Sequence, residues 1–88
     1  MYSESVVVEN RTGLHARPAS VFTDAAQRFK SAINVRKGED SADAKSILYL
    51  ISLGVFKGTE IVIEADGPDE REAVTALVGL VKSKFGEE

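Results

Sequence analysis

Residues 60–66, Glu-Ile-Val-Ile-Glu-Ala-Asp, are the stretch that decides the fold. Apolar residues stand at positions 61, 63 and 65, and they alternate with Glu60, Val62 and Glu64. This period of two is typical of a β-strand with one apolar face and one mixed face. Such a strand belongs to a sheet with one face packed against the core and the other exposed to solvent, as antiparallel sheets commonly are.

A helix is predicted directly after this strand. Gly67-Pro68-Asp69 opens it, and we expect Pro68 to lie in its first turn, where a proline loses no hydrogen bond. Carboxylates near its start and Lys82 near its end suit the helix dipole, and Gly86 can terminate it. Its predicted buried stripe is Ala73, Val74, Leu77, Val78 and Val81.

Upstream, strand and helix patterns alternate. The predicted elements are a strand over residues 2–8, an amphipathic helix from about 16 to 30, a strand around 33–35 and a short strand near 41–43. The order β-α-β-β-α-β-α predicts an α+β fold in which one antiparallel sheet carries all helices on its apolar face.

The remaining element is the apolar run at residues 47–53, which lies between Ser46 and Gly54. A serine before such a run and a glycine after it favour a short helix with Ser46 as its N-cap, although a buried strand is the alternative. In a helix, Leu50 and Leu53 are the predicted core positions.

The composition excludes several classes of function. The chain has 88 residues, a formal net charge of −3, no cysteine and one histidine, and we expect one domain over residues 1–88. Disulfides, thiolate catalysis and cysteine-based or histidine-based metal sites are excluded, and we expect no metal and no cofactor. Nothing resembles the basic stripe of a nucleic-acid binder, a membrane span or a secretory signal, so we expect a cytoplasmic protein that binds no nucleic acid and does not insert into membranes.

His15 is the candidate functional residue. It stands between a glycine-containing loop and a predicted helix start, where unpaired N–H groups and the helix dipole favour an anion. We expect the amides of Ala16 and Arg17 to be the donors, with the Arg17 guanidinium adding a fork suited to phosphate. An imidazole has an unperturbed pKa of about 6.5 and is nucleophilic when neutral, so it could accept a phosphoryl group. A cap or surface histidine is the plainer interpretation.

The stretch Gly13-Leu14-His15-Ala16-Arg17-Pro18-Ala19 resembles the active-site signature of HPr, the histidine-containing phosphocarrier family of the bacterial sugar phosphotransferase system. A second block, residues 44–47 with 52–54, resembles the regulatory-serine region of HPr from Gram-positive-type bacteria. The resemblance covers essentially the whole chain and implies an open-faced β-sandwich of four antiparallel strands and three helices.

The resemblance also implies roles for residues near the histidine. His15 would accept a phosphoryl group on Nδ1 from phosphorylated Enzyme I and pass it to the EIIA part of a sugar permease. Arg17 would steady the phosphate, with the Thr12 hydroxyl nearby. The protein would be a phosphocarrier and not an enzyme, and we expect a monomer.

Ser46 would be the target of the ATP-dependent HPr kinase/phosphorylase. By resemblance, phosphate there slows transfer from Enzyme I and promotes binding to a CcpA-type repressor. An exposed docking patch would consist of Ser20, Ile47, Leu48 and Ile51. Tyr49 is bulkier than expected beside that patch and could alter partner choice or simply be exposed.

Two other functions stay open. One is a mainly regulatory binding module like the relative Crh, acting through Ser46, although Crh has lost the active histidine that this chain keeps. The other is a domain that binds an anion at the His15 helix start without a covalent bond.

Overall fold

In a computed structural model that describes residues 1–86, four strands form one antiparallel sheet. The strands are β1 (Tyr2–Val7), β2 (Ala32–Lys37), β3 (Asp40–Asp43) and β4 (Glu60–Asp66). Their spatial order is β1-β4-β2-β3, so the decisive strand β4 pairs with β1 on one side and β2 on the other. The predicted strands are confirmed to within a residue or so.

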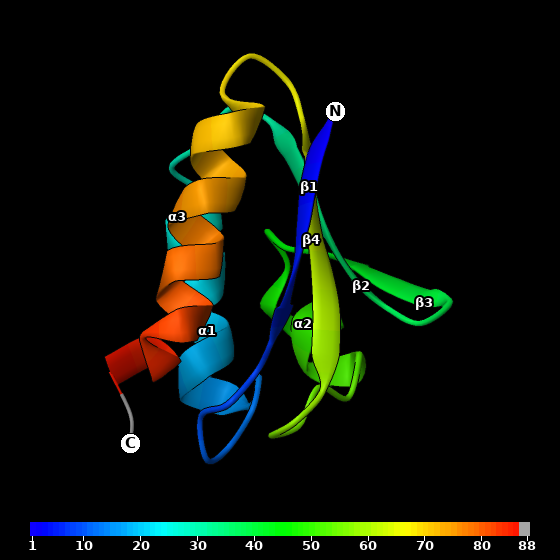
Figure 1. The fold of residues 1–88 in the computed structure, drawn as a ribbon, viewed down its shortest axis with the longest axis vertical. Helices are drawn as coiled ribbons and strands as arrows, with labels where there is room; N and C mark the ends of the chain where they lie inside the picture. Colours follow the sequence, from blue (N-terminus) through cyan, green and yellow to red (C-terminus); the bar gives the residue numbers. More distant parts are fainter. Residues whose placement is uncertain (87–88) are drawn as a thin grey trace.

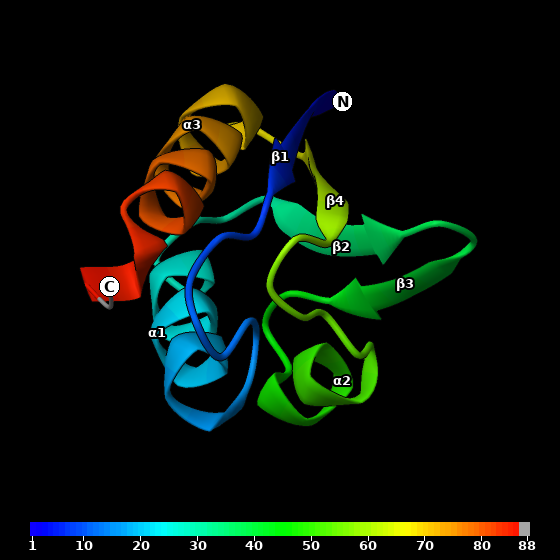
Figure 2. The same cartoon turned by 60° about the horizontal axis from the view of Figure 1, so that its bottom comes forward.

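Three helices cover one face of this sheet (Figures 1 and 2). They are α1 (Ala16–Ala26), α2 (Ile47–Ser52) and α3 (Glu70–Lys82), followed by a short 3-10 turn, η1 (Lys84–Gly86). The element order and the one-sided arrangement are those of the predicted α+β open-faced sandwich. No helix within residues 1–86 is both long and apolar enough to cross a bilayer.

The alternation in β4 explains this one-sided covering. Ile61 and Ile63 are fully buried on the helix side and pair in register with Val6 and Glu4 of β1. On the opposite face Glu64 forms a salt bridge with Arg36 of β2, whose Nε lies 3.2 Å from the Glu64 carboxylate. A slip of one residue would exchange the two faces, so the apolar alternation fixes the register.

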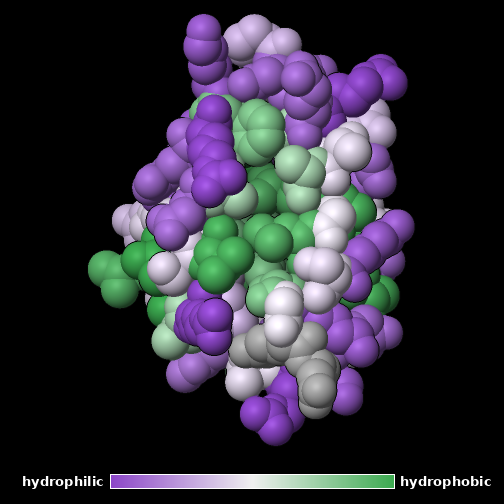
Figure 3. Space-filling model, turned by 90° about the vertical axis from the view of Figure 1, so that its left-hand side faces the viewer, coloured by the Kyte–Doolittle hydropathy of each residue, from purple (hydrophilic) through white to green (hydrophobic). Residues whose placement is uncertain are grey.

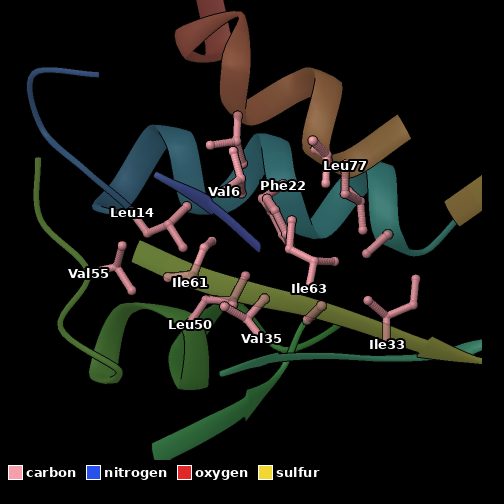
Figure 4. Close-up of a cluster of buried hydrophobic side chains, with 14 of the residues drawn as sticks. Val6, Leu14, Phe22, Ile33, Val35, Leu50, Val55, Ile61, Ile63 and Leu77 are labelled. Atoms are coloured by element: carbon pink, nitrogen blue, oxygen red, sulfur yellow. The ribbon is translucent and has the colours of Figure 1, made fainter. Parts of the chain in front are cut away.

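The core lies between the sheet and the helices (Figure 4). Phe22 of α1, Leu50 of α2 and Leu77 of α3 are fully buried, and burial of each such side chain contributes about 1.5–3 kcal/mol. The predicted stripe of α3 and the core positions Leu50 and Leu53 are confirmed as buried. On the helix side, hydrophobic residues are concentrated in the middle of the face and hydrophilic residues surround them (Figure 3).

Three predicted helix ends were wrong. Helix α1 ends at Ala26 and not near residue 30. Beyond Ala26 the Arg28 and Phe29 N–H groups donate to carbonyls three residues back, and Lys45 Nζ donates to the Phe29 carbonyl at 2.8 Å. Pro68 lies before α3 and not in its first turn, because Asp69 is the N-cap residue. Helix α3 ends at Lys82, well before Gly86.

Ser46 occupies the predicted N-cap position of α2, but its side chain makes no capping hydrogen bond. Other contacts fix the turn that leads into the helix. The Ser46 N–H donates to the Asp43 carbonyl at 3.0 Å, and the Lys45 N–H donates to Asp43 Oδ1 at 2.9 Å. The predicted N-cap position of Ser46 is therefore confirmed, although the backbone turn is held without the hydroxyl.

Candidate functional site

His15 is the N-cap residue of α1, with an extended backbone (φ −98°, ψ −170°). Its carbonyl accepts the Ala19 N–H at 2.8 Å and starts the helix, while its side chain makes no capping bond and is exposed. The backbone of His15 is thus held by α1, and its imidazole is left for solvent or a ligand.

The first turn of α1 carries the donors that the sequence predicted. Ala16 and Arg17 are its first two residues, and their N–H groups have no acceptor within the helix. Pro18, the third, is buried and has no N–H to satisfy. No acidic residue lies in this turn, so the positive end of the helix dipole is not neutralised by its own side chains.

Two arginines add positive charge here. Arg11 and Arg17 are exposed, and neither forms a salt bridge within residues 1–86. Thr12 is also exposed and lies in the same loop, three residues before His15. A guanidinium can donate two parallel hydrogen bonds to a phosphate, so the surroundings of His15 suit a small, multiply charged anion.

A close contact between two loops fixes the backbone before His15. The Leu14 N–H donates to the Val55 carbonyl at 3.0 Å, and Leu14 itself is buried in the core beside Val55 (Figure 4). At Gly13 the backbone is left-handed (φ +64°), and a Cβ there would lie 2.3 Å from the Val55 oxygen. Only glycine fits this position without displacing backbone.

The second predicted region lies on α2, at the same end of the molecule as the start of α1 (Figure 2). Helices α1 and α2 pack against one another. Ser46 is half-buried, Leu48 and Tyr49 are largely exposed (73% and 63%), Ile47 is 36% exposed, and Ile51 is half-buried against the core. Ser20 is half-buried in α1.

Comparison with known proteins assigns the family. The profile of the PTS-HPr family, described as the PTS HPr component phosphorylation site, matches residues 2–83. The chain belongs to the HPr family. Its sequence is 44% identical to the phosphocarrier protein HPr of Neisseria meningitidis over 87 residues, covering 99% of this chain and 98% of that protein.

Other HPr relatives agree with this assignment. The HPr-like protein Crh of Bacillus subtilis is 42% identical over 84 residues, which is 96% of this chain. The crystal structure of HPr-C-His from Thermoanaerobacter tengcongensis superimposes with a TM-score of 0.97 at 48% identity, covering 100% of this chain and 99% of that one. The fold and the phosphocarrier family are thereby established.

Sequence reasoning missed two residues of this HPr chain that belong to, or bond, the loop after α2, which contacts the His15 loop. Phe56, in the loop after α2, is 66% exposed, and its Cα would lie 2.7 Å from a Cβ on Gly13. Lys37, on β2, donates from Nζ to the Gly54 carbonyl at 2.9 Å. A phenylalanine outside every predicted element was the one available signal for Phe56, and none was available for Lys37.

The candidate site is on an open surface and not in a cavity. A groove of about 560 Å³ lies between β3 and α2, but neither His15 nor Ser46 lines it. Within residues 1–86, no group of three or more potential ligand side chains could hold a metal ion. An exposed histidine suits a phosphocarrier of the HPr family, because a carrier presents its group to successive proteins.

Proposed function

We propose that this chain carries a phosphoryl group on Nδ1 of His15. It would accept the group from phosphorylated Enzyme I and pass it to EIIA domains of sugar permeases, in the cytoplasm. In each transfer a bond from phosphorus to the acceptor nitrogen forms as the bond to the donor breaks, so no cofactor is consumed. The observation that carries this proposal is the exposed imidazole at the N-cap of α1, which makes no capping bond.

The electrostatics of α1 support the proposal. A phosphoryl group on His15 would bring about two negative charges to a helix start that has no acidic side chain in its first turn. The amides of Ala16 and Arg17 and the Arg17 guanidinium would donate to its oxygens. Thr12 is proposed as a further contact. These donors would stabilise the phosphorylated form without holding it irreversibly, because they lie at the surface.

The exposed side chains of α2 support a docking role. Ile47 and Leu48 present apolar surface to solvent, and an apolar patch beside a reactive group is typical of a protein-binding site. We propose that Enzyme I and EIIA contact these residues together with Ile51 and Ser20. Tyr49 adds a large exposed ring at the same helix and is a candidate for partner preference.

The test is phosphorylation by Enzyme I and phosphoenolpyruvate, followed by intact-mass spectrometry. We expect the wild-type chain to gain one acid-labile phosphoryl group and His15→Ala to gain none. Equal gains in both proteins, or no gain in either with an active Enzyme I, would refute the proposal. Asn34→Ala, a change on the open face of the sheet, is the control for folding and handling.

A second proposed function is regulation through Ser46. Its side chain makes no capping bond and the residue is only half-buried, so a kinase could modify it without loss of a helix cap. Modification by HPr kinase/phosphorylase would place about two negative charges beside the patch on α2. We propose that this slows transfer from Enzyme I and favours a CcpA-type repressor.

The regulatory function is tested separately with HPr kinase/phosphorylase and ATP. We expect one acid-stable phosphate on the wild-type chain and none on Ser46→Ala, whereas Ser52→Ala, at the other end of α2, should behave like wild type. A chain that is modified at Ser46 but takes no phosphoryl group on His15 would favour the Crh-like alternative. Reversible phosphate binding without a covalent product would favour the anion-binding alternative.

A further inference from the structure

Lys37 reaches from β2 to the loop that follows α2. Its Nζ donates a half-buried hydrogen bond to the Gly54 carbonyl at 2.9 Å. A hydrogen bond from a charged donor is roughly twice as strong as one between neutral groups. The ammonium also lies at the C-terminal end of α2, where the helix dipole favours a cation. Lys37 therefore fixes the peptide that follows α2.

The peptide held by Lys37 adjoins the one that holds the His15 loop. Val55, the next residue, accepts the Leu14 N–H at 3.0 Å, and Leu14 directly precedes His15. Because the two carbonyls belong to consecutive residues, we expect a displacement of the Gly54 peptide to shift the Val55 carbonyl as well. Two hydrogen bonds thus connect the sheet to the residue before the histidine.

The far end of the same loop is held independently. The Gly58 N–H donates to the Val8 carbonyl at 2.6 Å, and the Thr59 N–H donates to the Phe56 carbonyl at 3.0 Å. Loss of the Lys37 contact would therefore loosen Gly54 and Val55 and leave the Phe56–Thr59 end of the loop in place. The effect should be local and not a general unfolding.

We infer that Lys37 is a positioning residue for phosphoryl transfer at His15, an inference that rests on the function proposed above. It holds the Val55 carbonyl where the Leu14 amide needs it, and so sets the orientation of His15 relative to the first turn of α1. Errors of about 1 Å in such geometry can cost on the order of a hundredfold in rate. We expect the contact to affect the rate of transfer and not docking, because Lys37 lies on β2 and acts through the Gly54 carbonyl.

The test compares Lys37→Met with Lys37→Arg and with Lys57→Met. Lys57 is exposed in the same loop, and its side chain has no hydrogen bond or salt bridge within residues 1–86, so its replacement removes the same charge without the contact. Two quantities are measured: the hydrogen-exchange rate of the Leu14 amide by NMR, and kcat and KM with this protein as the acceptor from phospho-Enzyme I.

For Lys37→Met we expect Leu14 exchange to rise about tenfold or more, in line with loss of a charge-assisted hydrogen bond. We also expect kcat to fall at least severalfold with KM within about twofold of wild type. Lys37→Arg should restore both quantities, since a guanidinium can also reach a carbonyl, and Lys57→Met should leave Leu14 exchange unchanged.

Unchanged Leu14 exchange in Lys37→Met would overturn the inference. So would an equal rise at Ile63 and Leu77, which would make Lys37 a general stabiliser, or a rise in KM with kcat unchanged, which would make it a docking residue. If the wild-type chain accepts no phosphoryl group, the proposed function fails, while Leu14 exchange still decides whether Lys37 holds the loop.

Discussion

The N-terminal ends of α1 and α3 differ in the charge that they carry. Helix α3 has Glu70 and Glu72 in its first turn and Asp69 as its N-cap residue, so its positive end is matched by its own carboxylates. Helix α1 has no acidic residue in its first turn and carries Arg17 there. Both helices are long enough to have an appreciable dipole, at 11 and 13 residues.

The difference separates a structural helix start from one suited to an external anion. At α3, Asp69 accepts hydrogen bonds from the backbone of Lys30 and from both the backbone and hydroxyl of Ser31, and so joins the connection between α1 and β2 to the start of α3. At α1, the comparable contacts hold only the backbone before His15 and leave its side chain exposed. The fold thus supplies carboxylates at the start of α3 and none in the first turn of α1, as the proposed phosphoryl site on His15 requires.

The largest effect is expected from Gly13→Ala, which disturbs the α1 end. The new Cβ would meet the Val55 oxygen and occupy a left-handed conformation, so the free energy of unfolding should fall by about 2–5 kcal/mol. Gly79→Ala, in α3, adds a Cβ that would meet no atom within 4 Å, and should instead raise the free energy of unfolding by about 0.5–1 kcal/mol. Urea unfolding measures both changes. A free energy of unfolding for Gly13→Ala within about 0.5 kcal/mol of wild type would show that the Gly13 and Val55 loops can move apart at little cost.

Arg17→Ala tests the charge difference directly. Loss of a fork of charged donors should lower kcat/KM for phosphoryl transfer by about tenfold or more and leave the melting temperature nearly unchanged, because Arg17 is exposed. Arg28→Ala removes the same charge beyond the other end of α1 and should have little effect. Equal losses in the two variants would mean that only net charge matters.

Asp69 provides a pH test of the α3 end. Hydrogen bonds from the Ser31 hydroxyl and the Lys30 amide lower the pKa of Asp69 from 3.8 to about 2. Since the folded-state pKa lies below the unfolded value, the stabilisation is present above about pH 4 and is lost as the pH falls toward 2.

Asp69→Asn should therefore reduce the melting temperature at neutral pH and flatten its fall between pH 4 and pH 2. Asp40→Asn, at an exposed position of β3, is the control. Thermal unfolding across this pH range measures the effect, and an unchanged pH profile in Asp69→Asn would show that the contact is not specific to the carboxylate.

The smallest effect is expected from Ser46→Asp on α2. A single negative charge beside the apolar patch should slow transfer from Enzyme I by about threefold to tenfold at low salt, and less at high salt, because exposed charges are screened. Ser52→Asp adds the same charge at the other end of the helix and should slow transfer less. A salt-independent loss would point to a changed α2 conformation, which circular dichroism and amide shifts would detect.

Periodic patterns made much of the fold predictable. The alternation of β4 and the stripe of α3 were confirmed because each depends on the side chains of one element. Helix ends were less predictable, since the backbone just beyond α1 bonds Lys45, a residue outside that helix. In the candidate site, too, local features were predictable and contacts between distant residues were not. The placement of His15 and Arg17 at a helix start is local, whereas the Gly13–Val55 contact and the Lys37 bond join residues far apart in sequence.

The most direct test of the account follows a labelled phosphoryl group through one cycle. The chain is phosphorylated with labelled phosphoenolpyruvate and Enzyme I, isolated, and then mixed with an EIIA domain. We predict that the label leaves His15 and appears on EIIA, and that without EIIA it stays on the carrier far longer. Label that is released as inorganic phosphate at the same rate with and without EIIA would contradict the claim that the α1 end holds a transferable group.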